Sequence, residues 1–400
     1  MKSKLAKALI VLSVTGALIG LLVTHSSLIQ HNVALRDSLS YWAAARLLVQ
    51  HQNPYSHDTV FALERQSGYS ADRPLVLRTP PWSLFMVLPL GLVNPLAAWV
   101  CWLGLLFLCL TVGVRVCARL YHKPNVSRMA FTVAAYLFAP VAACLVSGQM
   151  GLLLMIGVVL FFWWVDHRPF LAGLVLIFPF AKPHLLAQFW LVLLIWVAVR
   201  RKRQVALGFG AALVMATLLA IVLDPHVFRD YREMLQQAAI GNEFIPALSG
   251  FLRLLFFRRY FWVQFLPMAI GSAWSLWYLH KNWPAWDWKV HGPALLVVAV
   301  LTTPYEWLSD ETVLLPAILQ ALVFILGIGA ALRLRSKLIL VALGLLDGLL
   351  LLILRFQIPF ATGIYFWSSL VWFGWYFYAK SLARHATHSK PATQAIPASL

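Results

Sequence analysis

The chain has 400 residues, of which 61% are hydrophobic and only 12% are charged, and its mean hydropathy is +0.78. A soluble domain carries about 25% charged residues, so this composition excludes an ordinary soluble protein. The net charge of +18 would suggest nucleic acid in a soluble chain, but here basic residues cluster at the ends of apolar runs. We therefore predict an all-α integral membrane protein that binds no nucleic acid, because helices satisfy their own backbone in lipid.

The apolar runs predict a polytopic helical bundle of about 12 spans. The first run, at about 5–23, follows a basic start and is long enough to be a retained span. The run at 80–113 contains Pro89 and Pro95, so we expect a short, partly inserted segment at 80–93 and a span at 95–113. Further spans are expected at 129–147, 150–165, 170–181, 185–199, 204–223, 257–279, 293–304, 311–331, 338–354 and 359–379.

The basic clusters all fall on one side if both termini are cytoplasmic. Most acidic residues then lie in the outer segments, so we expect an extracytoplasmic functional surface on a plasma-membrane protein. Residues 1–380 are predicted to form one membrane domain, and 381–400 a disordered tail rich in Ala, Thr, Ser and Pro. The outer segments are 30–79, Ser147–Gln149, Lys182–His184, 224–256 and Thr303–Glu311.

The first outer loop contains the most informative stretch. After Asp37 the sequence favours a helix with Tyr41 and Trp42 on one face, which we expect to lie along the membrane interface. Asn53-Pro54-Tyr55 ends this helix, because proline cannot continue it. Asp37 has two interpretations: a general base at the lipid–water boundary, or an N-cap of the helix. Spacing alone favours the N-cap.

Polar residues at the re-entry point of this loop and at the other outer turns are candidates for binding an anion or a substrate. An arginine can hold a phosphate by paired hydrogen bonds, and an isolated outer lysine suggests a fixed anionic partner. Snorkelling of the same side chains to the interface is the structural alternative. The candidates are Arg78, Gln149, Lys182, His184, Glu306 and Asp310.

No metal site is predicted. The sequence has no DxD pair, P-loop, HExxH or GxSxG motif, and its four cysteines lack CxxC spacing and are expected to pack in the core. The mid-span Asp347 is expected to be packed or paired, because an isolated carboxylate is costly in a membrane.

Several of these stretches, in this order, resemble the GT-C glycosyltransferases that use polyprenyl-phosphate sugars, and specifically the family 87, α-mannosyltransferase-like group. The resemblance covers most of the chain, and each matched motif falls on the predicted outer side. The matched stretches are Asp37 to Ala45, Asn53 to Tyr55, Thr79 to Trp82, Gly148-Gln149, Lys182-Pro183 and Thr303 to Pro316. Two positions depart from the family pattern. Gln52 stands where the family commonly has glycine, and Glu306-Trp307 stands in the turn at Thr303–Glu311, where the family often has other polar residues.

The resemblance implies a GT-C type fold and a hexosyltransferase, with mannose as the expected sugar. Asp37 is then the base that deprotonates an acceptor, while Lys182, Arg78 and Gln149 bind the phosphate of a polyprenyl-phosphate donor. His184, Tyr41, Trp42, Asn53, Tyr55, Glu306 and Asp310 are expected to complete the substrate site. The implied partners are the lipid-linked donor, a lipid or glycan acceptor of the cell envelope and membrane lipids, with no metal or other cofactor.

The sequence leaves two other hypotheses for the function open. A transporter or lipid flippase predicts charged groups along a path near mid-membrane, whereas most acids here lie at the outer boundary. A non-catalytic subunit of an envelope assembly complex predicts that replacing Asp37 by Asn leaves function intact.

Overall fold

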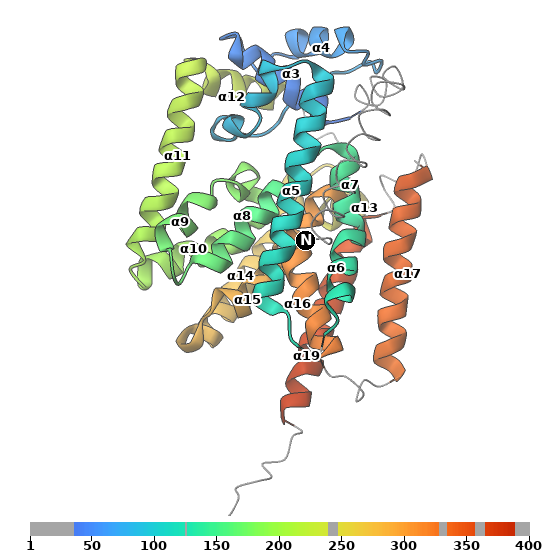
Figure 1. Cartoon of the computed structure of the whole chain (residues 1–400). Helices are drawn as coiled ribbons and strands as arrows, with labels where there is room; N and C mark the ends of the chain where they lie inside the picture. The colour runs from blue at the N-terminus through green and yellow to red at the C-terminus, as the bar shows by residue number, and fades with distance from the viewer. Residues whose placement is uncertain (1–35, 125, 239–246, 328–333, 357–364, 389–400) are drawn as a thin grey trace, which may run out of the picture. The chain divides into compact units, whose positions relative to one another are not determined.

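The computed structural model describes residues 36–124, 126–238, 247–327, 334–356 and 365–388, and the secondary structure of these residues is helical, with no strand. Figure 1 labels the helices along the chain. The predicted first span, 5–23, lies outside the described residues, as do the last twelve residues of the predicted tail. The final helix, α19, continues to His388. The α-helices are α3 Ser38–Val49, α4 His57–Gln66, α5 Pro95–Tyr121, α6 Arg128–Leu137, α7 Ala139–Ser147, α8 Gly151–Trp164, α9 Pro169–Val175, α10 Ala187–Val199, α11 Arg203–Leu223, α12 Val227–Gln237, α13 Leu248–Phe256, α14 Leu266–Asn282, α15 Trp288–Thr302, α16 Leu315–Leu326, α17 Leu334–Phe356 and α19 Ser368–His388.

Short 3-10 helices join several of these elements. They are η1 Pro81–Met86, η2 Leu88–Leu92, η3 Pro179–Ala181, η4 Pro183–Leu186, η6 Phe261–Phe265, η7 Trp283–Ala285, η8 Leu308–Leu314 and η10 Tyr365–Trp367. The predicted short segment at 80–93 is thus formed by η1 and η2, and α5 follows it from Pro95. Proline lies in the first turn of both 3-10 helices, where its missing N–H costs no bond.

In the part of the chain that the structure describes, three helices are long and apolar enough to cross a membrane: Pro95–Tyr121, Arg203–Leu223 and Leu308–Leu326, which joins η8 to α16. Two bent pairs raise this number to as many as five, and two further apolar helices are shorter. The helical membrane class is therefore supported, whereas the predicted count of about 12 spans is not reached by the described residues. One physical reason is that Pro140 and Pro183 lie at breaks within apolar runs, which gives bent pairs rather than single long helices.

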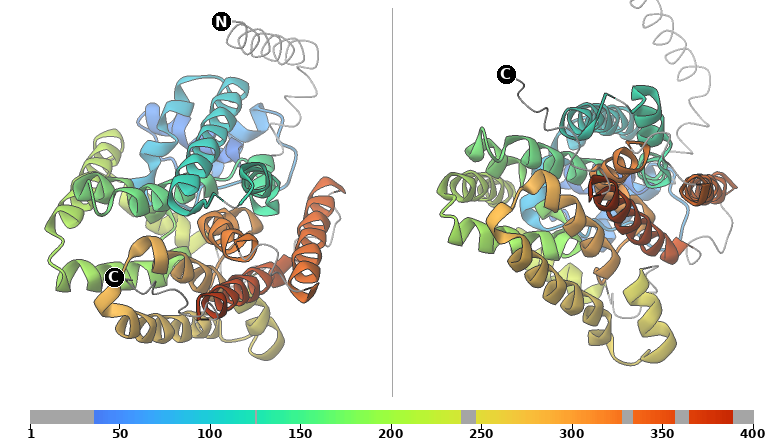
Figure 2. Two further views of the ribbon diagram at one scale, coloured as in Figure 1. Left: turned by 60° about the horizontal axis from the view of Figure 1, so that its bottom comes forward. Right: turned by 90° about the horizontal axis from the view of Figure 1, so that it is seen from below.

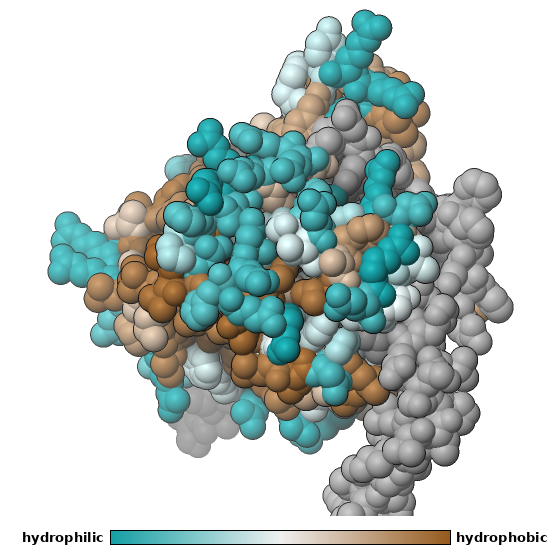
Figure 3. Space-filling model, turned by 90° about the horizontal axis from the view of Figure 1, so that it is seen from above, coloured by the Kyte–Doolittle hydropathy of each residue, from teal (hydrophilic) through white to brown (hydrophobic). Residues whose placement is uncertain are grey.

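The described residues divide into two compact units, which we describe separately. Unit 1 comprises residues up to Gly104 together with Leu218–Ala238, and unit 2 comprises Leu105–Thr217 and the residues from Ala239 onward. Unit 1 contains the first loop and α12, whereas unit 2 contains most of the apolar helices. Figure 3 views the structure from the end where α4 lies in Figure 1, and hydrophilic side chains cover much of that face.

In unit 1 the predicted helix after Asp37 is present as α3, which packs closely on η2. A Cβ atom added at Gly91 would lie 2.4 Å from the carbonyl oxygen of Ala45, so only glycine permits this approach. The Trp42 Nε1 donates to the carbonyl of Val93, and the Arg46 guanidinium donates to the carbonyl of Gly91. Residues all around α3 are buried, and the predicted position of this helix along the membrane interface is not confirmed.

Glu64 is a buried carboxyl group within the first loop. Its side chain is 0% exposed, one oxygen accepts a hydrogen bond from the Leu75 backbone N–H, and the other oxygen is buried with no partner. Burial raises the pKa of Glu64 to about 7, and the Leu75 N–H offsets only part of this effect. The folded-state pKa of Glu64 therefore lies above its ordinary value near 4.5. The contribution of Glu64 to stability is complete below a pH of about 4.5 and is lost as the pH rises through about 7.

We expect Glu64→Gln to stabilise the protein at pH 8.5 and to have little effect at pH 4.5. The amide keeps an acceptor for Leu75 and removes a buried charge, and we expect a gain of roughly 2 kcal/mol, since one pKa unit is worth about 1.4 kcal/mol and screening reduces the full shift. Thermal unfolding midpoints at both pH values measure this, with the exposed Asp58→Asn as the control. An equal effect of Glu64→Gln at the two pH values would contradict it.

In unit 2, α14, α15, α16 and α19 pack beside one another, as Figures 1 and 2 show. Asp347 on α17 accepts a hydrogen bond of 2.9 Å from the backbone N–H of Ala139, the first residue of α7. The backbone N–H groups at the start of a helix have no partner within that helix. Asp347 thus supplies an acceptor at the break between α6 and α7, in agreement with its predicted role as a packed or paired residue.

We expect Asp347→Ala to lower stability by about 1–2 kcal/mol, because it leaves the Ala139 N–H without its acceptor. Asp347→Asn keeps an acceptor oxygen and should lose less. Unfolding midpoints of the two variants in the same detergent measure the difference. Equal midpoints for wild type and Asp347→Ala would show that another group satisfies this helix start.

Candidate functional site

Asp37 directly precedes α3 in unit 1 and is half-buried. Its backbone has helical angles, and its side chain makes no capping hydrogen bond to the helix. Its carbonyl oxygen accepts a bond from the Ser40 hydroxyl. The side-chain N-cap, which spacing alone favoured, is therefore not formed.

The aromatic and amide residues predicted to bind substrate in the first loop hold the loop together. Tyr41 is 4% exposed and packs edge-on against Trp102, with ring centroids 5.4 Å apart. The Asn53 side-chain oxygen accepts from the Tyr55 backbone N–H at 2.8 Å, which forms an Asx turn before α4. Trp42 and Asn53 thus direct polar groups to backbone atoms of the protein, and substrate binding by these residues stays a prediction.

Tyr55 connects this turn to the segment that contains Arg78. Its hydroxyl donates to the carbonyl of Thr79 at 2.8 Å, and its ring contacts that of Tyr231 on α12 at 5.2 Å. Burial, followed by the nearby Tyr231 and Asp224, raises the pKa of Tyr55 well above its usual value, so it remains a neutral donor. Half-buried Arg78 precedes this anchored residue, so the Tyr55 bond fixes the backbone from which its guanidinium extends.

Lys182 lies at the sharper of the two bent pairs of apolar helices in unit 2. The segments Pro169–Ala181 and Pro183–Val199 meet at 116°, with Lys182 between them. Its ammonium donates to Asp310 Oδ1 at 2.6 Å, and the two side chains are only 13% and 1% exposed. This pair satisfies the predicted requirement for an anionic partner and joins two of the sequence motifs.

The late turn holds Asp310 rigidly. Its second oxygen accepts from the backbone N–H of Trp307 at the start of η8, and the Trp307 indole donates to the Tyr305 hydroxyl. The His184 ring lies edge-on to Tyr305 at 5.8 Å, and the His184 carbonyl accepts from the Thr303 hydroxyl. The Lys182–His184 turn and the Thr303–Glu311 turn are therefore connected at several points.

The turn at Gly148 and Gln149 packs against the same region. Gly148 has φ of 72°, a left-handed conformation that ends α7, and the Cys144 thiol donates to the carbonyl of Gln149. A Cβ atom added at Gly151 would lie 2.4 Å from the Ser309 carbonyl oxygen, so the start of α8 approaches the backbone of η8. Three predicted motifs thus converge in unit 2.

Glu306 and Glu311 bring two more buried carboxyl groups to this region. Glu311 accepts from the Ser368 hydroxyl and from the Trp372 indole, so both of its oxygens have partners on α19. Glu306 is 2% exposed and one of its oxygens is buried without a partner. Burial, followed by Glu311 and Asp310, raises the pKa of Glu306 well above its usual value.

The sequence profile of glycosyltransferase family 87 matches residues 79–328. This match covers more than half of the chain, including all three converging motifs. The chain belongs to glycosyltransferase family 87. Neither a curated protein nor a solved structure was found to match the chain.

Family membership makes the protein a glycosyltransferase and agrees with a GT-C type membrane enzyme. Of the predicted site residues, the family match contains Gln149, Lys182, His184, Glu306 and Asp310. Asp37 and Arg78 precede it, so their roles rest on the sequence motifs and on unit 1 alone. Among the described residues, no group of three or more His, Cys, Asp or Glu side chains is arranged to hold a metal ion.

Proposed function

We propose that this glycosyltransferase moves a hexose, with mannose as the expected sugar, from a polyprenyl-phosphate carrier to an extracytoplasmic lipid or glycan acceptor. The observation that carries the phosphate part of the proposal is Lys182. Its nearly buried ammonium makes one hydrogen bond within the described residues, to Asp310, and an ammonium has three donors. Two N–H groups therefore remain for the phosphate of a lipid-linked donor.

The proposed reaction is a direct displacement. The acceptor hydroxyl oxygen attacks the anomeric carbon, the bond from that carbon to the phosphate oxygen breaks, and the sugar configuration inverts. The proton of the acceptor passes to the Asp37 carboxylate, which acts as the general base. The departing polyprenyl phosphate takes the bonding electrons, and Lys182 stabilises its negative charge, with Arg78 and Gln149 as further donors.

Asp310 acts in this proposal by positioning Lys182. One oxygen of Asp310 is bonded to the ammonium and the other to the Trp307 backbone, so its position is fixed from both sides. A lysine held in this way meets an incoming phosphate without first being ordered, which lowers the entropic cost of binding. A monophosphate held by cationic side chains needs no metal ion, so we expect transfer to persist in a chelator.

Membership in a glycosyltransferase family disfavours both alternatives, namely a transporter or lipid flippase and a non-catalytic assembly subunit. The test is sugar transfer by purified protein in lipid, with radiolabelled polyprenyl-phosphate mannose or a nucleotide-linked mannose and a mixed acceptor pool. We expect label to move from the lipid-linked donor only, with and without EDTA. Transfer from the nucleotide sugar alone, or complete loss of transfer with EDTA, would contradict the proposal.

A further inference from the structure

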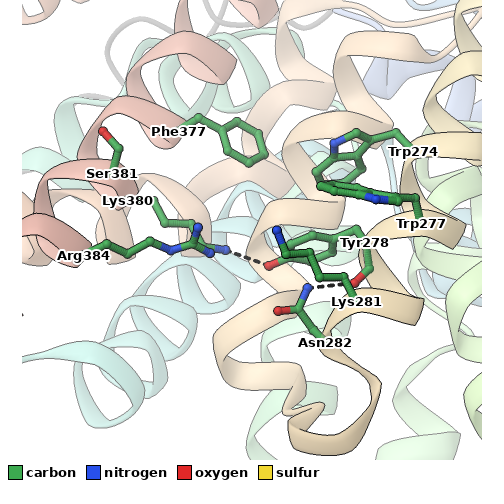
Figure 4. A pocket seen from close by; sticks show the side chains of 9 residues that line it. All are labelled: Trp274, Trp277, Tyr278, Lys281, Asn282, Phe377, Lys380, Ser381 and Arg384. Carbon is green, nitrogen blue, oxygen red and sulfur yellow. Dashed lines mark hydrogen bonds between the residues drawn. The ribbon is translucent and has the colours of Figure 1, made fainter.

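A cavity of 320 Å³ lies between α14 and α19 in unit 2, away from the Lys182–Asp310 pair in the sequence and on different helices. Figure 4 shows that aromatic rings form one wall and that long cationic side chains extend into the space from both helices. The residues that matter are Trp274, Trp277, Tyr278, Lys281, Lys380 and Arg384. The proposed transfer reaction uses none of them.

The cavity is strongly cationic. Lys281, Lys380 and Arg384 line it, and no aspartate or glutamate is among its lining residues. Lys380 donates to the Tyr278 hydroxyl at 2.7 Å, and this hydroxyl is also 2.9 Å from His291 Nδ1. Within the described residues, neither Lys281 nor Lys380 forms a salt bridge with a carboxylate. Lys281 and Lys380 share this space without a carboxylate and therefore repel each other, and an entering anion relieves that repulsion.

The ionisation of Lys380 agrees with this description. Lys380 lies beyond the end of the last predicted span at 379. Burial, followed by the charge of Arg384, lowers its pKa to about 8. Because Tyr278 occupies one ammonium donor, two others can bind a ligand.

An apolar surface leads to the cavity along α14. Leu266, Ile270 and Trp277 are 45%, 70% and 54% exposed, and their spacing of four and seven residues places them along one side of the helix. Trp277 belongs both to this surface and to the cavity wall, where the Lys281 ammonium lies 5.2 Å from its ring centre. A ligand that matches both features has an anionic head and a hydrocarbon chain.

We propose that this cavity binds the phosphate-bearing headgroup of an anionic membrane phospholipid, with an acyl chain lying along the exposed face of α14. The ends of α14 and α19 that form the cavity are on the cytoplasmic side in the predicted topology, where anionic lipids attract basic side chains. Tryptophan is favoured at this depth of a membrane, because its ring is apolar and its N–H is polar. The site is separate from the donor site and does not depend on the proposed reaction.

Native mass spectrometry of delipidated protein tests the proposal, with phosphatidylglycerol as the probe and phosphatidylcholine and inorganic phosphate in parallel. Each basic residue near an anionic membrane surface is worth about 1 kcal/mol, so we expect Lys281→Gln/Lys380→Gln to weaken phosphatidylglycerol binding at least tenfold. The charge-matched control is Arg203→Gln/Lys337→Gln, which changes two exposed cations elsewhere in unit 2. Lys281→Arg/Lys380→Arg should retain most of the affinity if charge is what binds.

Three outcomes would overturn the proposal. Equal loss in the cavity and control variants would show a general effect of net charge. Equal affinity for phosphatidylcholine would show that the cavity does not select an anionic head. Binding of inorganic phosphate as tight as that of the lipid would make the cavity a site for free phosphate. Helix content and unfolding midpoints of all variants show whether each remains folded.

Discussion

Replacing Asp37 by Asn is expected to lower the rate of sugar transfer by about 10²–10⁴-fold, the range that a general base contributes. Asparagine has nearly the same shape but cannot accept the acceptor's proton. The Asp37 side chain makes no capping bond to α3, so the substitution removes no helix cap, and the unfolding midpoints of both proteins show whether the variant remains folded. Initial rates at saturating donor and acceptor measure the effect.

The control for this variant is Asp72→Asn, which removes an exposed carboxylate from the same loop of unit 1. It should retain the wild-type rate. If Asp37→Asn also retains that rate, Asp37 is not the base. Glu306 then becomes the next residue to replace, because one of its buried oxygens has no partner.

Lys182→Gln is expected to abolish transfer and also to destabilise the protein by about 3 kcal/mol, because it leaves the buried Asp310 carboxylate without its cation. Loss of activity in this variant alone therefore has two explanations. The double variant Lys182→Gln/Asp310→Asn separates them. It removes both charges, keeps an oxygen that can accept from the Trp307 N–H, and should recover most of the lost stability.

Recovery of stability without recovery of transfer is the result that supports a phosphate-binding role for Lys182. We expect the double variant to remain about 10²–10³-fold slower than wild type, as for the loss of one donor to a developing negative charge. Lys182→Arg retains the charge and should recover part of the rate. A double variant that is both stable and fully active would show that the ion pair is structural.

Much of the architecture was predictable from local sequence patterns. Apolar runs and prolines indicated the positions of α5, α8, α11 and the bend at Lys182, because these signals act within a few residues of the chain. The helix after Asp37 was also predicted. Its all-round burial was not, because that depends on Gly91, which lets η2 approach its backbone.

The candidate site was predictable in its residue types and less so in their roles. Lys182 and Asp310 were both identified, and the turn motifs indicated that each lies at a bend between helices. Their pairing joins positions 128 residues apart, and no local pattern encodes such a contact. The sequence analysis did not identify the two partners of Glu311, for the same reason. These partners, Ser368 and Trp372, lie on α19, the last helix.

The roles of the first-loop residues also depend on tertiary contacts. Tyr41, Trp42, Asn53 and Tyr55 were expected to bind substrate, which stays a prediction, and within unit 1 they contact neighbouring rings and backbone groups. Sequence identifies such residues as a motif and does not distinguish a residue that binds substrate from one that shapes the loop. The sequence around Glu64 did not indicate that this side chain is buried, because its burial follows from the path of residues 69–75 across α4.

The most direct test of the account is one side-by-side transfer measurement with radiolabelled polyprenyl-phosphate mannose. Wild type, Asp37→Asn, Asp72→Asn and Lys182→Gln/Asp310→Asn are compared at equal amounts of folded protein in the same lipid. The account predicts transfer by wild type and Asp72→Asn and little by the other two. Equal transfer by all four proteins would contradict the proposed site, and no transfer by wild type from this donor, with transfer from a nucleotide sugar, would contradict the proposed function.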